Sequence, residues 1–468
     1  MKIGREILHS EERKELRKSL ATLVEYLNSN VALSDAERKA RRMKATSELS
    51  YANIPYGYDV AFDWFWFPGV GKVDLYGDER KALWDLIHLI REYFPDTFSW
   101  DYIYNVITGP DSLIERLVAS RGLKEEAIDR ELDILLDHLV SSIDEWVVSV
   151  PIVNLKIEVW PIFHEGGDEW CLPIGKVKIY AIKDMPEFNP EWLVEWQRES
   201  LESAQYAART KVKAGDPQQA IKKAIIETQN ALNIIRLFLS SAIRTDHYAF
   251  YSKMNIVGRG KKGIQLIAAR RVASPEDDPL SYNHSWRVLG VEPETFIHEA
   301  AFQYMKDNGF EEINQIFSAE NPNSLQQQIV RAISWFAEGT NSDNRVDGFI
   351  KYVIALEVLL GREGKKDDEG KRSRIAERAA FLLQAVFKWD RRQQIVKNLK
   401  RLYDKRSALV HGSSFQVGME ELSQLELYAR HIIFAFARKQ KGYNTFQDFL
   451  GWIDRQRFAV NGAGAEAK

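Results

Sequence analysis

Apolar residues recur every three or four positions over most of the chain, a spacing that predicts amphipathic helices. In the first part of the sequence this spacing predicts two helices within 5–50 and further helices at 78–95, 111–145 and 290–320. The dipeptide Asn321-Pro322 breaks the pattern. Beyond it, the same spacing predicts five further helices, at 325–338, 345–360, 371–387, 391–411 and 420–440.

The middle of the chain also contains apolar residues that alternate with polar ones, which is typical of strands. Alternation at 155–159 and at 177–180 predicts a β-hairpin or meander, and segments 247–257 and 263–272 predict a second hairpin. Two long helices are expected between them, at 190–214 and 217–243. Their junction, Gly215-Asp216-Pro217, offers a C′ glycine, an N-cap aspartate and a first-turn proline in order.

These patterns predict a mainly α protein. We expect an N-terminal helical region at 1–145, an α+β middle region with small β-hairpins at 146–322, an all-α helical domain at 323–445 and a C-terminal tail at 446–468.

Composition narrows the class of protein. Of the 468 residues, 45% are hydrophobic and 28% are charged, which indicates a folded protein. The single cysteine, Cys171, excludes an intramolecular disulfide and any Cys-cluster metal site. The charged N-terminus predicts no secretory signal, and no apolar run approaches the length of a membrane helix. We therefore expect a cytoplasmic protein without a membrane partner.

The net charge of −3 conceals an uneven distribution along the chain. Between Lys371 and Arg406 there are 12 Lys and Arg residues but only 3 acidic ones. Such a strip can neutralise phosphates, so it predicts an RNA partner. The alternative is a solvated face that balances the acidic N-terminal region. The candidate RNA-binding residues are Lys371, Arg372, Arg374, Lys397, Lys400, Arg401 and Lys405.

Several short motifs lack the context that their chemistry requires. Gly258-Arg-Gly-Lys-Lys-Gly is flanked by strand-like segments, so a basic hairpin tip explains it better than a dinucleotide site. The segment beginning at His298 has Phe302 where a zinc-binding helix needs a second histidine. An unrelated hydrolase in the α+β region stays open as an alternative, and it would need a pocket lined by His164, Glu165 or His298.

The segment from Arg406 to His411 has the spacing R-x4-H at the predicted end of a helix, with Gly412 as the C′ residue. An Arg and a His in a last turn can simply complement the helix dipole. Further helices are predicted upstream of this motif, in a fixed order, at 332–337, 349–360 and 375–383. Together these segments resemble the Apea-like branch of the HEPN superfamily, whose motif is R-x4–6-H.

The resemblance implies a helical module that pairs into a homodimer and acts as a metal-independent endoribonuclease without a cofactor. Arg406 and His411 would be the catalytic pair, with Ser407, Tyr403 and Glu357 in support. Ser407 stands where many members have Asn, Asp or His, although Ser is common in the Apea-like branch. The resemblance also implies a toxin or anti-phage defence effector whose N-terminal region senses a phage or host trigger. A non-catalytic RNA- or nucleotide-binding module is the alternative.

The residue types suit RNA cleavage, because RNA carries its own nucleophile, the 2′-hydroxyl. Imidazole groups in general exchange a proton near neutral pH, so His411 can move one, and a guanidinium such as that of Arg406 can stabilise charge at phosphorus. Five residues of ideal helix place the two side chains about 140° apart. Two chains that meet across a dyad would bring one of each together.

Overall fold

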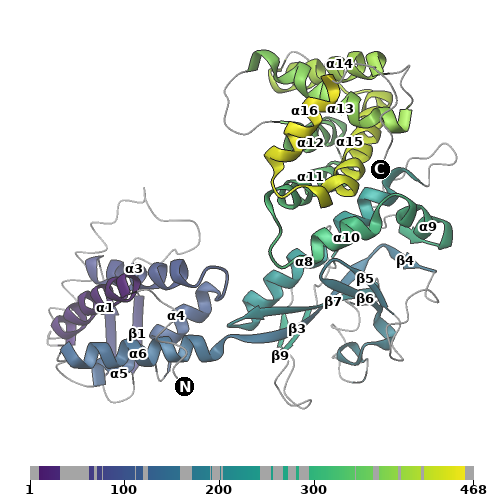
Figure 1. The fold of residues 1–468 in the computed structure, drawn as a ribbon. Coiled ribbons are helices and arrows are strands. Elements are labelled where there is room, and N and C mark those ends of the chain that lie inside the picture. Colours follow the sequence, from purple (N-terminus) through teal and green to yellow (C-terminus); the bar gives the residue numbers. More distant parts are fainter. Residues whose placement is uncertain are drawn as a thin grey trace. The chain divides into compact units, whose positions relative to one another are not determined.

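The fold is that of a computed structural model. The described residues are 10–31, 63–67, 71–75, 77–110, 112–119, 125–158, 171–189, 191, 201, 204–242, 255–256, 267–271, 281–283, 295–342, 344–361, 368–387, 392–412 and 416–458. They form two compact units (Figure 1). The first comprises 1–147, 212–223 and 269–281, and the second comprises 148–211, 224–268 and 282–468.

The first unit is built mainly from helices packed around one apolar core. Leu20, Leu83 and Leu86 are fully buried in this core. The apolar stripe predicted at Leu132 and Leu139 also faces it, because side chains three, four and seven positions apart share one side of a helix. The elements are α1 (Ser10–Val31), the antiparallel pair β1 (Asp63–Phe67) and β2 (Gly71–Leu75), α3 (Gly77–Tyr93), α4 (Trp100–Thr108), α5 (Leu113–Ala119) and α6 (Glu125–Ser142).

The middle region forms a sheet whose order among the described strands is β10-β9-β3-β7-β6-β5, with β8 paired to β3. Its pairs β5–β6 and β6–β7 are antiparallel. The short strands β4 and β11 pair separately. The bounds are β3 (Asp144–Val153), β4 (Leu155–Ile157), β5 (Cys171–Ile174), β6 (Val177–Ala181), β7 (Ala204–Ala214), β8 (Asn255–Ile256), β9 (Ile267–Arg271), β10 (Ser281–Asn283) and β11 (Thr295–Ile297).

Two predictions for this region are wrong. The segment 204–214, predicted within a helix, is β7, in which Tyr206, Ala208, Thr210 and Val212 are buried at alternate positions. Alanine favours helices, but sheet packing overrides that preference here. The strand beginning at Leu155 does not form a hairpin with 177–180. It pairs in parallel with β11, about 140 residues further along the chain.

Helix α8 (Pro217–Ala242) begins at the predicted junction. The Asp216 carboxylate accepts hydrogen bonds from the Gln219 N–H at 3.0 Å and the Ser99 N–H at 2.7 Å, so its role as the N-cap is confirmed. Gly215 is not the C′ residue of a helix, as was predicted, because strand β7 ends directly before it. A Cβ atom at this position would lie 1.9 Å from the Phe98 ring, so the close packing requires glycine.

From Glu299 onward the described elements are helices (Figure 1). The helix expected at 290–320 is wrong at its start, because 295–297 is strand β11 and helix begins only at Glu299. It is also divided at Gly309, whose φ of +96° favours glycine. The five helices predicted beyond Asn321 are confirmed within a few residues. The bounds are α9 (Glu299–Asp307), α10 (Phe310–Ser318), α11 (Ser324–Thr340), α12 (Arg345–Leu360), α13 (Asp368–Phe387), α14 (Arg392–Val410), α15 (Met419–Lys439) and α16 (Phe446–Phe458).

Helix α16 lies in the segment that was expected to be a tail. It packs against the other C-terminal helices through the fully buried side chains of Phe449 and Ile453. Asp454 accepts two hydrogen bonds from the guanidinium of Arg378 on α13, at 2.8 and 2.6 Å. The Arg378 side chain is only 2% exposed. Residues 446–458 are therefore part of the helical fold.

Candidate functional site

The candidate site lies at the C-terminal end of α14, where the R-x4-H motif falls. The inward face of this helix carries Ile395, Leu399 and Leu402, which are buried against neighbouring helices. The backbone N–H of His411 still bonds the Ser407 carbonyl at 3.0 Å, so the helical turn continues through the motif. Gly412 then ends it with a φ of +74°, in the C′ role predicted from the sequence.

Arg406 lies on the inward side of this last turn. Ideal helix geometry places it within about 40° of Ile395, Leu399 and Leu402, and its side chain is half-buried. Its Nε atom is buried, yet among the described residues nothing accepts a hydrogen bond from it. A buried N–H without a partner is costly, because the water that it loses is not replaced. Such groups in folded proteins call for an explanation, which a bound anion would provide.

His411 lies on the outward side of α14 and is exposed. Within the part of the chain that the structure describes, its imidazole has no hydrogen bond or ion pair. The described residues therefore leave both motif side chains without a partner. It does not bring them together, because about 140° of helix separates them and Arg406 faces inward.

Of the residues predicted to support the pair, Tyr403 and Glu357 do meet. The Tyr403 hydroxyl donates a hydrogen bond to the Glu357 carboxylate on α12. Lys371 on α13 lies 3.5 Å from the other oxygen of the same carboxylate. The Glu357 carboxylate thus links α12, α13 and α14. Its partner on α14, Tyr403, lies one turn before Arg406. Ser407 is exposed, and its backbone carbonyl receives the His411 N–H.

The predicted RNA-binding residues fall into two groups. Four of them already have acidic neighbours: Lys371 pairs with Glu357, Arg372 with Asp404 at 2.9 Å, and Arg401 and Lys405 with Glu421 at 2.9 and 3.8 Å. The other three, Arg374, Lys397 and Lys400, have no ion pair with any described carboxylate. Arg378, which belongs to the same basic run, is buried against Asp454 and is not available to phosphate.

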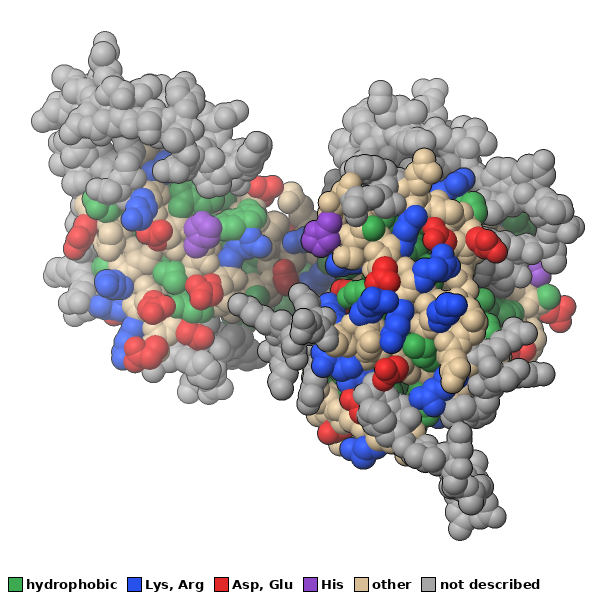
Figure 2. All heavy atoms as spheres, turned by 90° about the horizontal axis from the view of Figure 1, so that it is seen from above, with side chains coloured by type: hydrophobic (Ala, Val, Ile, Leu, Met, Phe, Trp, Pro, Cys, Tyr) green, Lys and Arg blue, Asp and Glu red, His purple; other side chains and the backbone are tan. Residues whose placement is uncertain are grey.

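The surface over α14 is nevertheless mainly basic. Figure 2 looks from above the view of Figure 1, in which α14 lies uppermost, and it shows Lys and Arg side chains gathered over the C-terminal helices with fewer Asp and Glu among them. The carboxylates of Asp404 and Glu421 were not singled out in the sequence. Glu421 could have been found as an acidic residue in the first turn of a predicted helix.

A second histidine of the helical part, His431 on α15, differs from His411. Burial, followed by repulsion from Arg430 and Arg438, lowers its pKa to about 4. The rings of Phe387 and Phe434 pack edge-on against it. Its imidazole is therefore neutral at pH 7 and is a poor proton donor there. Among the described histidines of these helices, His411 is the one that solvent reaches freely.

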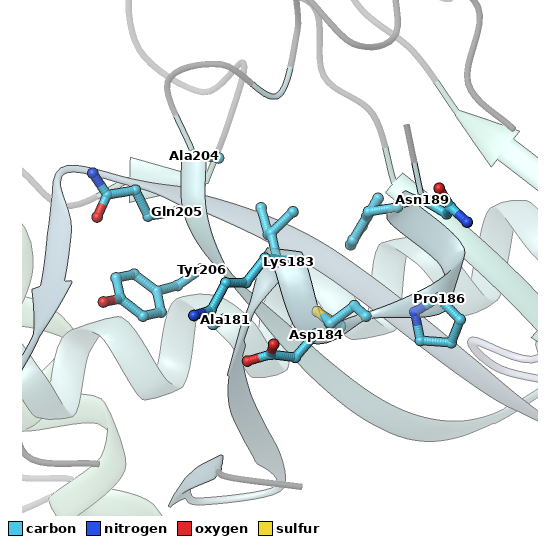
Figure 3. Close-up of a pocket in the computed structure, with 11 residues that line it drawn as sticks. Ala181, Lys183, Asp184, Pro186, Asn189, Ala204, Gln205 and Tyr206 are labelled. Carbon is cyan, nitrogen blue, oxygen red and sulfur yellow. The ribbon is translucent and has the colours of Figure 1, made fainter. Parts of the chain in front are cut away.

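The middle region holds a pocket of about 870 Å³ between β7 and the turns at 182–188 (Figure 3). Its described lining includes the polar residues Lys183, Asp184 and Gln205 together with apolar ones, but no histidine. His298, proposed for the hydrolase alternative, caps α9 instead, because its Nδ1 accepts the Ala301 N–H. His164 and Glu165 lie outside the described residues.

The described residues contain no group of three or more His, Cys, Asp and Glu side chains placed to hold a metal ion. None of the described helices is both long and apolar enough to cross a membrane. Comparison of the chain with family models, curated proteins and solved structures gave no match.

Proposed function

We propose that the chain is a metal-independent endoribonuclease of the HEPN type, with Arg406 and His411 as its catalytic pair. One observation carries the proposal. At the end of α14, neither side chain of the R-x4-H motif has a hydrogen-bond partner among the described residues, and the Arg406 Nε is buried. Buried N–H groups in folded proteins usually have an acceptor, so the Arg406 Nε could take an anion. The exposed imidazole of His411 is open to a substrate.

The proposed reaction uses the 2′-hydroxyl of RNA as the nucleophile. Its oxygen forms a bond to the adjacent phosphorus while the bond to the 5′ oxygen breaks, which gives a 2′,3′-cyclic phosphate and a 5′-hydroxyl. The proton leaves the 2′-hydroxyl for the His411 imidazole, and an imidazolium returns a proton to the departing oxygen. The Arg406 guanidinium stabilises the negative charge that grows on the phosphoryl oxygens.

The wider role rests on the HEPN resemblance. We propose a cytoplasmic toxin or anti-phage defence effector in which the N-terminal region senses the trigger. The helical unit that contains α1 and α3–α6 would be the sensing part, since it has a core of its own.

Cleavage of mixed RNAs by the purified chain in EDTA tests the proposal directly. We expect cleavage without added metal and products that end in a 2′,3′-cyclic phosphate, because the proton carrier and the fixed cation are both side chains. Activity that EDTA abolishes and magnesium restores, on an RNA that stays unfolded in both conditions, would contradict the metal-independent mechanism. A chain that binds RNA but never cuts it would be the non-catalytic module instead.

We also expect a homodimer through the C-terminal helices. The angle between Arg406 and His411 is the physical reason, since one helix cannot aim both at one phosphate. Sedimentation at micromolar concentration should give twice the monomer mass. Active protein that sediments only as a monomer would contradict this expectation.

Mixing two inactive variants tests whether the pair forms across the dyad. A dimer that combines one Arg406→Ala chain with one His411→Ala chain has one intact pair if each site takes one residue from each chain. Random exchange should then restore about a quarter of the wild-type activity, because half of the dimers are mixed and each carries one of two sites. No restoration after verified subunit exchange would place the pair within one chain.

A further inference from the structure

The outward face of α14 carries a line of polar side chains that leads to His411. On an ideal helix Lys397, Lys400, Asp404, Ser407 and His411 fall within an arc of about 80°. All five are at least partly exposed. The line is about 21 Å long, since 14 residues separate its ends at 1.5 Å per residue. A substrate that reaches His411 along the helix would therefore pass both lysines.

The charges along this line are not alike. Lys397 and Lys400 have no ion pair with any carboxylate that the structure describes, so none of those carboxylates competes with a phosphate there. Asp404 stands between them and His411, and its carboxylate is held by Arg372 at 2.9 Å. In contrast, Arg401 and Lys405 on the flank of the helix are drawn toward Glu421. The available positive charge is thus concentrated at one end of the line.

We infer that an unpaired RNA strand lies along this outward face, with phosphates on Lys397 and Lys400 and its scissile phosphate near His411. This inference rests on the proposed function. The basic surface in Figure 2 gives the charge complementarity, and the width of a single helix, about 10–12 Å with its side chains, suits one strand. A duplex would also hold the 2′-hydroxyl out of line with the departing 5′ oxygen.

Asp404 gives the inference a distinctive consequence. A strand that runs from the lysines to His411 must pass its carboxylate, which repels phosphate and occupies Arg372. Replacing Asp404 with asparagine removes the repulsion and frees the guanidinium for the strand. Loss of an acidic residue near a binding face often raises affinity through net charge alone, so the effect must be compared with that of a distant change.

The experiment measures binding rather than cleavage, so its result does not depend on nuclease activity. A fluorescent single strand whose 2′-hydroxyls are methylated, and which therefore cannot be cut, is titrated with the full-length protein at several salt concentrations. The variants are Lys397→Gln with Lys400→Gln, and Asp404→Asn. The matched controls are Lys441→Gln, an exposed lysine without a described ion pair, and Asp448→Asn, an exposed aspartate on α16.

Each phosphate contact contributes about 0.7 to the slope of log affinity against log salt for a single strand. The double lysine variant should therefore lose about 1.4 from the slope and bind about 25-fold more weakly at 0.1 M salt. Asp404→Asn should bind about fivefold more tightly, and both controls should stay within about twofold of the wild type. An unlabelled duplex of the same sequence should compete poorly.

Three results would overturn the inference. The first is a double lysine variant that binds like the wild type in this assay. The second is a Lys441→Gln control that weakens binding as much as each lysine change of the double variant does. The third is a duplex that competes as well as the single strand. A protein that shows the expected binding pattern but cuts no RNA would contradict the proposed nuclease and leave the strand path intact. A protein that cuts RNA with no dependence on these lysines would support the proposed nuclease and contradict the strand path.

Discussion

Replacing His411 with alanine is expected to lower the rate of RNA cleavage about a hundredfold or more, because a positioned general acid or base typically contributes that much. Replacing Arg406 with alanine should cause a loss of similar size through the missing charge stabilisation. Folding should survive the change at His411, since the side chain is exposed and such a residue at a helix end contributes only about 0.3 to 1 kcal/mol.

Two matched variants separate catalysis from stability. His88→Ala removes an exposed imidazole from the other unit, and Arg345→Ala removes an exposed guanidinium at the start of α12. Both should cleave at the wild-type rate. If His411 moves the proton, free imidazole should restore part of the activity of His411→Ala, whereas a structural role would give no such rescue. A folded His411→Ala protein that cuts RNA at the wild-type rate would exclude the proposed mechanism.

The C-terminal helices were predictable because their signals are local. Apolar residues at helical spacing set the helices, and Asn323 and Asn344 cap two of them with side-chain hydrogen bonds to the backbone. The strand β7 was missed because its many alanines favour a helix, while its alternation of buried and exposed residues depends on the sheet around it. The pairing of β4 with β11 has no local signal at all.

The candidate site was predictable only in part. The angle between Arg406 and His411 follows from their spacing on an ideal helix, and the helical hydrogen bond from the His411 N–H to the Ser407 carbonyl continues through the motif. The contact between Tyr403 and Glu357, 46 residues apart, depends on how α12 and α14 pack. A count of charges along the chain also treats all basic residues alike. It cannot distinguish Lys397, which is exposed, from Arg378, which is buried.

Asp454→Ala is expected to lower the free energy of unfolding by about 3 kcal/mol or more. The reason is the burial of Arg378, whose guanidinium is 2% exposed and donates two hydrogen bonds to this carboxylate. Without Asp454, a full positive charge stays buried with only the Leu360 carbonyl, 2.5 Å away, as its described acceptor. Removal of one partner costs more than the pair itself contributes, because the remaining charge cannot regain its water.

Chemical denaturation of the full chain, followed by circular dichroism, measures the loss. A second change tests its cause: Arg378→Met in the Asp454→Ala background removes the stranded charge and fills much of the same volume, so it should recover part of the lost stability. The matched control is Asp448→Asn on the same helix, where the carboxylate is exposed and accepts a hydrogen bond from the Thr445 hydroxyl. It should change the free energy of unfolding by less than about 1 kcal/mol. If Asp454→Ala were no less stable than Asp448→Asn, the Arg378–Asp454 pair would not stabilise the packing of α16 on α13. Residues 446–458 would then behave more like the tail that the sequence predicted.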